Sequence, residues 1–207
     1  MSYFPFFVEL SGKRGLIVGG GRVALGKAEK LLAFGPRLTV VAPEVLPELA
    51  VYPGLFVLRR PFRPEDLEGM DFVIAAADPA TNREAARLCR ERNIPVNVVD
   101  DRAACTFLFP ALVKRGRLTV GISTGGASPT AAVHVKEQVE ELLPEKLEGI
   151  LDFLERLRPA LKEVVPNPQR RAALHAALFR RCLEVGGPLN DWQLGEVLEE
   201  MGEERGG

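Results

Sequence analysis

The chain has 207 residues, of which 46% are hydrophobic and 27% charged, a composition typical of an ordered globular protein with room for one domain and a smaller one. Its 27 Lys and Arg residues balance 28 Asp and Glu residues, so the net charge of −1 excludes an overall attraction to nucleic acid or to an anionic membrane. Its 3 cysteines are scattered, as is typical of a reducing compartment, and no apolar run approaches the roughly 20 residues that span a bilayer. We therefore expect a cytoplasmic protein with neither a nucleic-acid nor a membrane partner.

Five short apolar runs in the first hundred residues predict five strands. They do not alternate polar with apolar residues, which is typical of strands buried on both faces of a parallel sheet. The predicted strands cover residues 15–18, 37–42, 55–58, 71–77 and 95–100.

Helical patterns separate several of these runs. After the first strand, apolar residues recur at helical spacing from Val23 to Leu32, and Gly35 ends that helix. After the fourth strand, Asn82 is the expected N-cap of a helix that carries Ala85 and Leu88. The repeated β-α-β order predicts an α/β fold with a Rossmann-type parallel sheet.

The pattern changes after residue 100. Residues 107–113 and 117–122 flank Lys114-Arg115-Gly116 and predict an antiparallel hairpin. Ser128 as N-cap and Pro129 at the first helical position predict a helix that runs to about Leu143. Beyond it the chain is helical, interrupted at three proline-containing points that include Pro159. The expected organisation is a Rossmann domain over 1–113, a hairpin-plus-helix module over 114–145 and a small all-helical domain over 146–207.

A glycine turn follows the first strand and begins the first helix, with the pattern Gly19-x-Gly21-x-x-Ala24. The first glycine permits the tight turn, and the next lets a diphosphate approach amides at the positive end of the helix. The alternative is a glycine-rich turn that binds nothing. The pattern predicts a dinucleotide, NAD, bound by Gly19, Gly20, Gly21, Arg22 and Val23.

The second strand ends without the acid that usually binds the ribose hydroxyls of NAD. Here the chain reads Ala42-Pro43-Glu44, so the ribose is bound either by Glu44 or by the backbone around Pro43. No arginine at this strand end favours a 2′-phosphate, so NAD is predicted over NADP. Asp78, after the fourth strand, completes the predicted cofactor-binding residues.

Three segments together point to one family: residues 19–24 with Lys27, residues 97–101, and residues 122–129. In this order and spacing the chain resembles the precorrin-2 dehydrogenase / sirohydrochlorin ferrochelatase family, the module also found at the N-terminus of siroheme synthase. The resemblance covers about residues 4–143. The longer members carry a uroporphyrinogen methyltransferase domain, for which this chain has no room.

The resemblance implies NAD-dependent oxidation of precorrin-2 to sirohydrochlorin in siroheme biosynthesis. In some members insertion of ferrous iron follows, so iron is a further candidate substrate. The resemblance also implies a homodimer with residues 114–145 as its dimerisation module, and a substrate cleft between that module and the Rossmann domain.

Asp100 matches the essential aspartate of that family, and we expect it at the end of the fifth strand. Ligands bind in the crevice outside the carboxyl ends of parallel strands, so a carboxylate there can accept a proton or guide a metal into the tetrapyrrole. The alternative is an aspartate that only caps a loop. Asp101 is expected to be a solvated neighbour or a turn residue.

A tetrapyrrole with many carboxylates needs basic partners. Lys114 and Arg115 on the hairpin and Lys136 on the next helix are therefore expected to bind substrate, although charged residues at turns are often merely solvated. Ser123, Thr124 and Gly125 either contact the substrate or form a tight turn; Thr124 aligns with a serine that is phosphorylated in some relatives. No metal site is predicted.

Two other functions compete with this hypothesis. Another small Rossmann reductase is disfavoured because the chain has no Tyr-x-x-x-Lys pair; its tyrosines are Tyr3 and Tyr52. An NAD-binding redox sensor is disfavoured because the helical tail shows no basic recognition helix.

Overall fold

The computed structural model describes residues 3–203 as two compact units, the first ending at Phe109 and the second beginning at Pro110. No helix in this described range is both long and apolar enough to cross a membrane.

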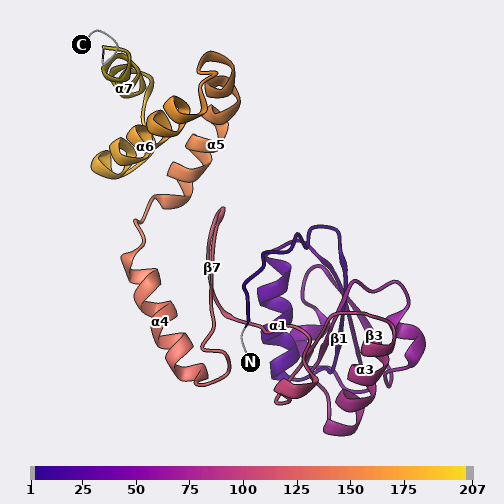
Figure 1. Ribbon diagram of the computed structural model, residues 1–207. Helices are drawn as coiled ribbons and strands as arrows, with labels where there is room; N and C mark the ends of the chain where they lie inside the picture. Colours follow the sequence, from indigo (N-terminus) through magenta and orange to yellow (C-terminus); the bar gives the residue numbers. More distant parts are fainter. Residues whose placement is uncertain (1–2, 204–207) are drawn as a thin grey trace. The chain divides into compact units, whose positions relative to one another are not determined.

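The first unit is built on a parallel sheet with the strand order β3-β2-β1-β4-β5 (Figure 1). The chain leaves β1 to form β2 and β3 on one side, then returns to form β4 and β5 on the other. The crevice between the carboxyl ends of β1 and β4 is therefore the switch point at which such sheets bind ligands. The strands are β1 (Arg14–Val18), β2 (Arg37–Ala42), β3 (Leu55–Arg59), β4 (Phe72–Ala75) and β5 (Val96–Val98).

Helices α1 (Arg22–Leu32) and α3 (Pro79–Glu91) cover opposite faces of this sheet, because successive strand residues point to opposite sides. Ile17 of β1 packs in one core with α1, whereas Leu16 packs in the other core with α3. Both faces are thus apolar, as the predicted strands require. Three short helices complete the unit: α2 (Pro47–Ala50), η1 (Pro64–Leu67) and η2 (Arg102–Ala104).

Two strands are shorter than the sequence predicts. β4 ends at Ala75 rather than at residue 77: the Ala76 amide still donates to Val18 O of β1, but the Ala77 amide donates to Asn82 Oδ1 in the first turn of α3. β5 ends at Val98, and the Val99 amide still donates to Ala75 O at 2.9 Å before the chain turns away. Asp100 consequently lies in the turn beyond the strand rather than at its last position.

The N-cap of α3 is also different from the predicted one. Asp78 caps the helix, with Pro79 at the first helical position, and its carboxylate accepts bonds from Ala80 N and Thr81 N. Asn82 lies within the first turn and its side chain binds the backbone of Ala77 in both directions. The prediction of Asn82 as the cap is therefore wrong.

The second unit begins with the predicted hairpin, formed by β6 (Ala111–Arg115) and β7 (Leu118–Ile122) in antiparallel register. The turn is shorter than the expected Lys114-Arg115-Gly116, because Lys114 and Arg115 belong to β6. Gly116 makes the turn in the left-handed region, with φ 51°. Helix α4 (Pro129–Leu142) follows, and Ser128 caps it through a bond from Ala131 N to Ser128 Oγ, as predicted.

Three helices close the chain: α5 (Leu147–Val164), α6 (Pro168–Val185) and α7 (Asp191–Glu203). Pro159 lies inside α5, so it does not interrupt the helix as expected. The hairpin turn packs on α5: Gly116 is close to the Glu148 side chain, and Arg117 forms ion pairs with Asp152 and Glu155. The helices share a core made of Ile150, Phe153, Leu161, Leu174, Leu178, Cys182, Leu189 and Val197. The predicted fold class is confirmed.

Candidate active site

The glycine turn lies at the switch point of the sheet, between β1 and α1. Gly19 has φ 125°, and a Cβ there would overlap the backbone carbonyl of Ala76, which follows β4. A Cβ on Gly20 would overlap the carbonyl of Glu44, which follows β2. Because both glycines are required by close backbone packing, the turn brings the ends of three neighbouring strands together.

Gly21 differs from its two neighbours because a Cβ there would meet nothing within 4 Å. It is the N-cap residue of α1, and among the described residues no side chain caps this helix. The first intrahelical bond runs from Leu25 N to Gly21 O, so the preceding amides have no helical acceptor. Arg22 and Val23 at this end are exposed. An open cradle of free amides at a helix N-terminus fits the diphosphate of a dinucleotide.

Pro43 and Glu44 are exposed just beyond β2, with the Glu44 carbonyl packed against Gly20. The structure thus places the candidate ribose-binding residues beside the glycine turn. Which of their groups would contact a ribose, the Glu44 carboxylate or the backbone, stays a prediction.

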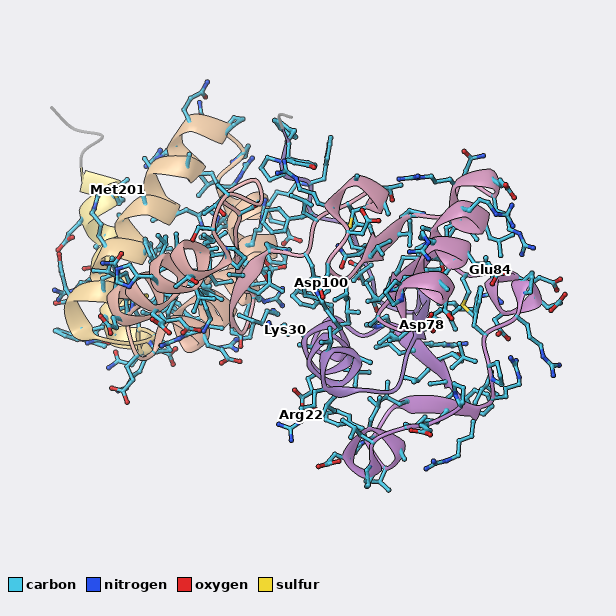
Figure 2. The ribbon with its side chains drawn as sticks, turned by 90° about the horizontal axis from the view of Figure 1, so that it is seen from below. Arg22, Lys30, Asp78, Glu84, Asp100 and Met201 are labelled. Carbon is cyan, nitrogen blue, oxygen red and sulfur yellow. The ribbon has the colours of Figure 1, made fainter. Side chains whose placement is uncertain are left out.

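Asp78 lies at the same edge of the sheet, after β4 (Figure 2). Besides two backbone amides, its carboxylate accepts a bond from Thr81 Oγ1 at 2.7 Å. The hydroxyl and amide of Thr81 hold the pKa of Asp78 below its usual range. Helix capping accounts for these contacts, and a contact between Asp78 and the cofactor stays a prediction.

Asp100 is exposed at the carboxyl edge, in the turn that follows β5 (Figure 2). Its φ of 60° is in the left-handed region, which Asp and Asn tolerate better than most residues. Its neighbour Asp101 is a turn residue, as expected, because its carboxylate caps η2 through Ala104 N. Within residues 3–203 the Asp100 carboxylate has no hydrogen-bond or ion-pair partner, so it is available to a ligand.

Cys105 holds the two ends of the Asp100 turn together, a role that the sequence did not indicate. Its sulfur accepts a bond from Val98 N at 3.1 Å and lies 3.3 Å from both Val98 O and Asp101 O. Asn97, buried on β5, donates to Phe107 O at 3.0 Å and approaches the same sulfur. The loop after β5 is therefore tied back to the strand on either side of Asp100.

Lys27 on α1 is a second residue whose environment the sequence did not reveal. Its ammonium lies 3.8 Å from the centroid of the Phe109 ring and is half-buried. Its pKa is lowered to about 8, mainly by burial and in addition by the charge of Lys30, whereas Cys105 raises it. Phe109 is remote from Lys27 in the sequence, so no local pattern could have predicted this contact.

The predicted substrate-binding residues belong to the second unit, where each has a structural partner. Thr124 Oγ1 donates to Ser128 O at 3.0 Å and accepts from Ser128 N, and Ser123 Oγ accepts from Gly125 N. These bonds form the tight turn that was the alternative to a substrate contact.

Two basic side chains of this unit converge on one residue of α4. Lys136 forms an ion pair of 2.7 Å with the Glu140 carboxylate, and Arg115 donates to the Glu140 carbonyl. Lys114 donates to Gly116 O at the hairpin turn. Substrate binding by these cations stays a prediction.

No group of three metal-binding side chains occurs in the part of the chain that the structure describes. His134 and His175 lie on different helices. Burial raises the pKa of Cys89 to about 11 and also raises that of Cys182, so both thiols are core residues, as expected for Cys89. The acid–base groups of interest are therefore those at the carboxyl edge of the sheet.

The strand order, the glycine turn at the switch point and the free amides of α1 define a nucleotide-binding Rossmann protein. The family described as "Putative NAD(P)-binding" matches residues 6–111, and the chain belongs to this family. Residues 115–142 match a second family, described as "Sirohaem biosynthesis protein central". Together these matches confirm the resemblance seen in the sequence.

Two similar curated proteins are siroheme synthase 2 of Aeromonas salmonicida, 38% identical over 95% of this chain, and siroheme synthase of Pseudomonas entomophila, 38% identical over 94%. The chain spans 42% of the length of each. A solved structure titled "SirC, precorrin-2 dehydrogenase" is similar over 97% of this chain and 100% of its own, with a TM-score of 0.75 and 26% identity.

Proposed function

We propose that this protein is an NAD-dependent precorrin-2 dehydrogenase, which oxidises precorrin-2 to sirohydrochlorin in siroheme biosynthesis. The observation that carries the proposal is the unpartnered Asp100 carboxylate, at the same edge of the sheet as the open glycine turn. The names of the similar proteins, siroheme synthase and precorrin-2 dehydrogenase, support the same substrate and reaction.

In this proposal the amides at the start of α1 bind the cofactor diphosphate, while Pro43 and Glu44 bind the adjacent ribose. When bound, the nicotinamide supplies an acceptor for the hydride that leaves the substrate. Asp100 accepts the proton that must leave with it, because its exposed carboxylate has no competing hydrogen-bond or ion-pair partner in residues 3–203. The Asp100 side chain is exposed to solvent.

The preference for NAD over NADP follows from charge at the end of β2. Glu44, whose backbone carbonyl packs against Gly20, carries a negative charge that would repel a 2′-phosphate on the adenine ribose. Titration with NADH and NADPH tests this point, and tighter binding of NADPH would contradict it.

The second unit provides the remaining proposed contacts. Ser123, Thr124 and Gly125 at the turn before α4, with Lys114, Arg115 and Lys136, are proposed to bind the carboxylates of the tetrapyrrole. We further propose that residues 114–145 form a homodimer interface and that the protein acts in the cytoplasm. Ferrous iron is a candidate second substrate, with siroheme as the product.

The test is anaerobic incubation of the protein with precorrin-2 and NAD, followed by absorbance as sirohydrochlorin forms. Asp100→Asn retains the side-chain shape and the tolerance for the left-handed turn but removes the base. We expect turnover to fall at least about 100-fold in this variant while NADH binding is unchanged. Turnover of Asp100→Asn at the wild-type rate would show that Asp100 is not the base. A wild-type protein that leaves precorrin-2 unchanged would contradict the proposed function. Added ferrous iron then reports whether siroheme also forms.

A further inference from the structure

Lys27 flanks the side of α1 that faces the sheet. Its neighbours Ala24 and Ala28 are fully buried, and its own ammonium lies over the Phe109 ring at 3.8 Å from the centroid. Side chains on a helix lean toward the helix N-terminus, so this ammonium is displaced from its own Cα toward the glycine turn.

Two residues that follow the Asp100 turn, Cys105 and Phe109, affect this ammonium. Cys105 raises the pKa of Lys27, and its sulfur accepts a bond from Val98 N at 3.1 Å, at the carboxyl end of β5. The same sulfur is 3.3 Å from Asp101 O, on the far side of Asp100. The Phe109 ring under the ammonium follows Phe107, whose carbonyl accepts a bond from Asn97 of β5, so Lys27 lies against the segment that returns from the Asp100 turn.

This charge lacks a counter-charge within the described residues. Its ammonium forms no ion pair with a carboxylate in residues 3–203, and Lys30, whose charge lowers its pKa, has the same sign. The face of an aromatic ring is a weak partner compared with a carboxylate or phosphate. Burial lowers the pKa of Lys27 to about 8. The contacts that the protein makes with the charged ammonium therefore do not compensate for its loss of hydration.

We propose that Lys27 is an anion-binding residue of this site, whose ammonium binds an oxyanion of a bound ligand. The inference rests on the proposed function, because that function supplies two ligands with such groups at this edge of the sheet. One is the diphosphate of the nucleotide, and the other is a carboxylate of the tetrapyrrole. Either would provide the counter-charge that the chain itself does not.

A purely structural role makes a different prediction. If Lys27 served only to hold Phe109 in place, a neutral side chain would destabilise the fold and leave ligand affinity unchanged in the folded protein. If Lys27 binds an anion, the neutral variant loses affinity without a loss of stability, because the cost of burying an uncompensated charge is also removed.

The experiment compares three variants of the full chain. Lys27→Met removes the charge and keeps the length, Lys27→Arg keeps the charge, and Lys30→Met removes an exposed charge from the same helix as a matched control. NADH affinity is measured by fluorescence titration without tetrapyrrole, and sirohydrochlorin affinity by absorbance titration without nucleotide. Both are measured near pH 7, below the pKa of Lys27, and urea unfolding is recorded for each variant.

We expect Lys27→Met to bind one of the two ligands about 10-fold more weakly, Lys27→Arg to recover most of that loss, and Lys30→Met to resemble the wild type. Loss confined to NADH identifies the diphosphate as the anion, and loss confined to sirohydrochlorin identifies a carboxylate. If Lys27→Met folds poorly, Lys27→Gln replaces it.

Wild-type affinity of the neutral variant for both ligands would overturn the inference, as would an equal loss in Lys30→Met. Failure of the proposed function gives a separate result, because the wild-type protein itself would then bind neither ligand.

Discussion

The half-buried ammonium of Lys27 should make the stability of the chain depend on pH. The pKa of this lysine is about 8 when folded, against 10.5 for a free side chain. Between these two values the unfolded chain binds more protons than the folded one, so stability should rise with pH; below about pH 8 both states are protonated and the full cost of burial applies.

Urea unfolding of the wild type and of Lys27→Met at about pH 7 and about pH 10 tests this expectation. The stability advantage of the variant should shrink at the higher pH. The comparison with the variant is needed because Cys89, whose pKa burial raises to about 11, also begins to titrate in this range. An advantage that is constant with pH would show that Lys27 is not the group responsible.

At the level of single residues, sequence reasoning placed Asp100 at the correct edge of the sheet, since the carboxyl ends of parallel strands share one edge. It did not predict that the residue adopts φ 60° beyond the strand. The environments of Cys105 and Lys27 could not be predicted either. Each depends on a loop conformation or on a partner remote in sequence, and neither leaves a periodic pattern.

The β1–α1 turn permits a prediction at the level of an element. Gly19→Ala should destabilise the protein by about 2 kcal/mol or more, because its φ of 125° and the Ala76 carbonyl both exclude a Cβ. Gly21→Ala should change stability by less than about 1 kcal/mol, since a methyl there enters open space at an N-cap with an ordinary backbone conformation.

The same pair of variants separates packing from binding. The methyl group of Gly21→Ala would occupy the space proposed for the diphosphate, so NADH affinity should fall about 10-fold in a protein that remains folded. Thermal unfolding and NADH titration of both variants provide the measurements. Unchanged affinity in Gly21→Ala would place the nucleotide elsewhere.

Element boundaries were harder to predict than the elements themselves. Apolar runs identified every strand of the parallel sheet; burial on both faces explains the continuous signal of β1 and β4, whereas β3 is apolar although Phe56 is exposed. The start of α3 was mistaken since Asp78 and Asn82 are both good caps; Pro79, favoured at the first helical position, was the overlooked signal. The hairpin turn was placed too early because a left-handed Gly116 lets two residues make the turn.

For the whole molecule, nucleotide binding should appear as added stability. A ligand that binds only the folded chain at 100 times its Kd contributes about 2.7 kcal/mol. Thermal unfolding should therefore shift upward with increasing NAD or NADH, and the shift should be smaller in Gly21→Ala. An unfolding temperature that does not respond to millimolar nucleotide would contradict the cofactor assignment.

The fold class was accessible from the sequence because the β-α-β repeat and the rule for its handedness leave few arrangements, whereas the strand order came only from the structure. The packing of helices in the second unit was harder to predict from the sequence, since it depends on which apolar helix faces contact one another. Pro159 illustrates this: it reads as a helix breaker, yet α5 continues through it while Phe153 and Leu161 on either side remain buried in a shared core.

The close fit between the hairpin turn and α5 constrains how this chain can be shortened or grafted. Gly116 has no room for a larger residue beside Glu148, and Arg117 finds its acidic partners on the same helix. Transfer of the hairpin and α4 to another scaffold without the helices that follow would remove the contacts between the turn and α5. The loop would then have to be redesigned, with a residue other than arginine at its tip.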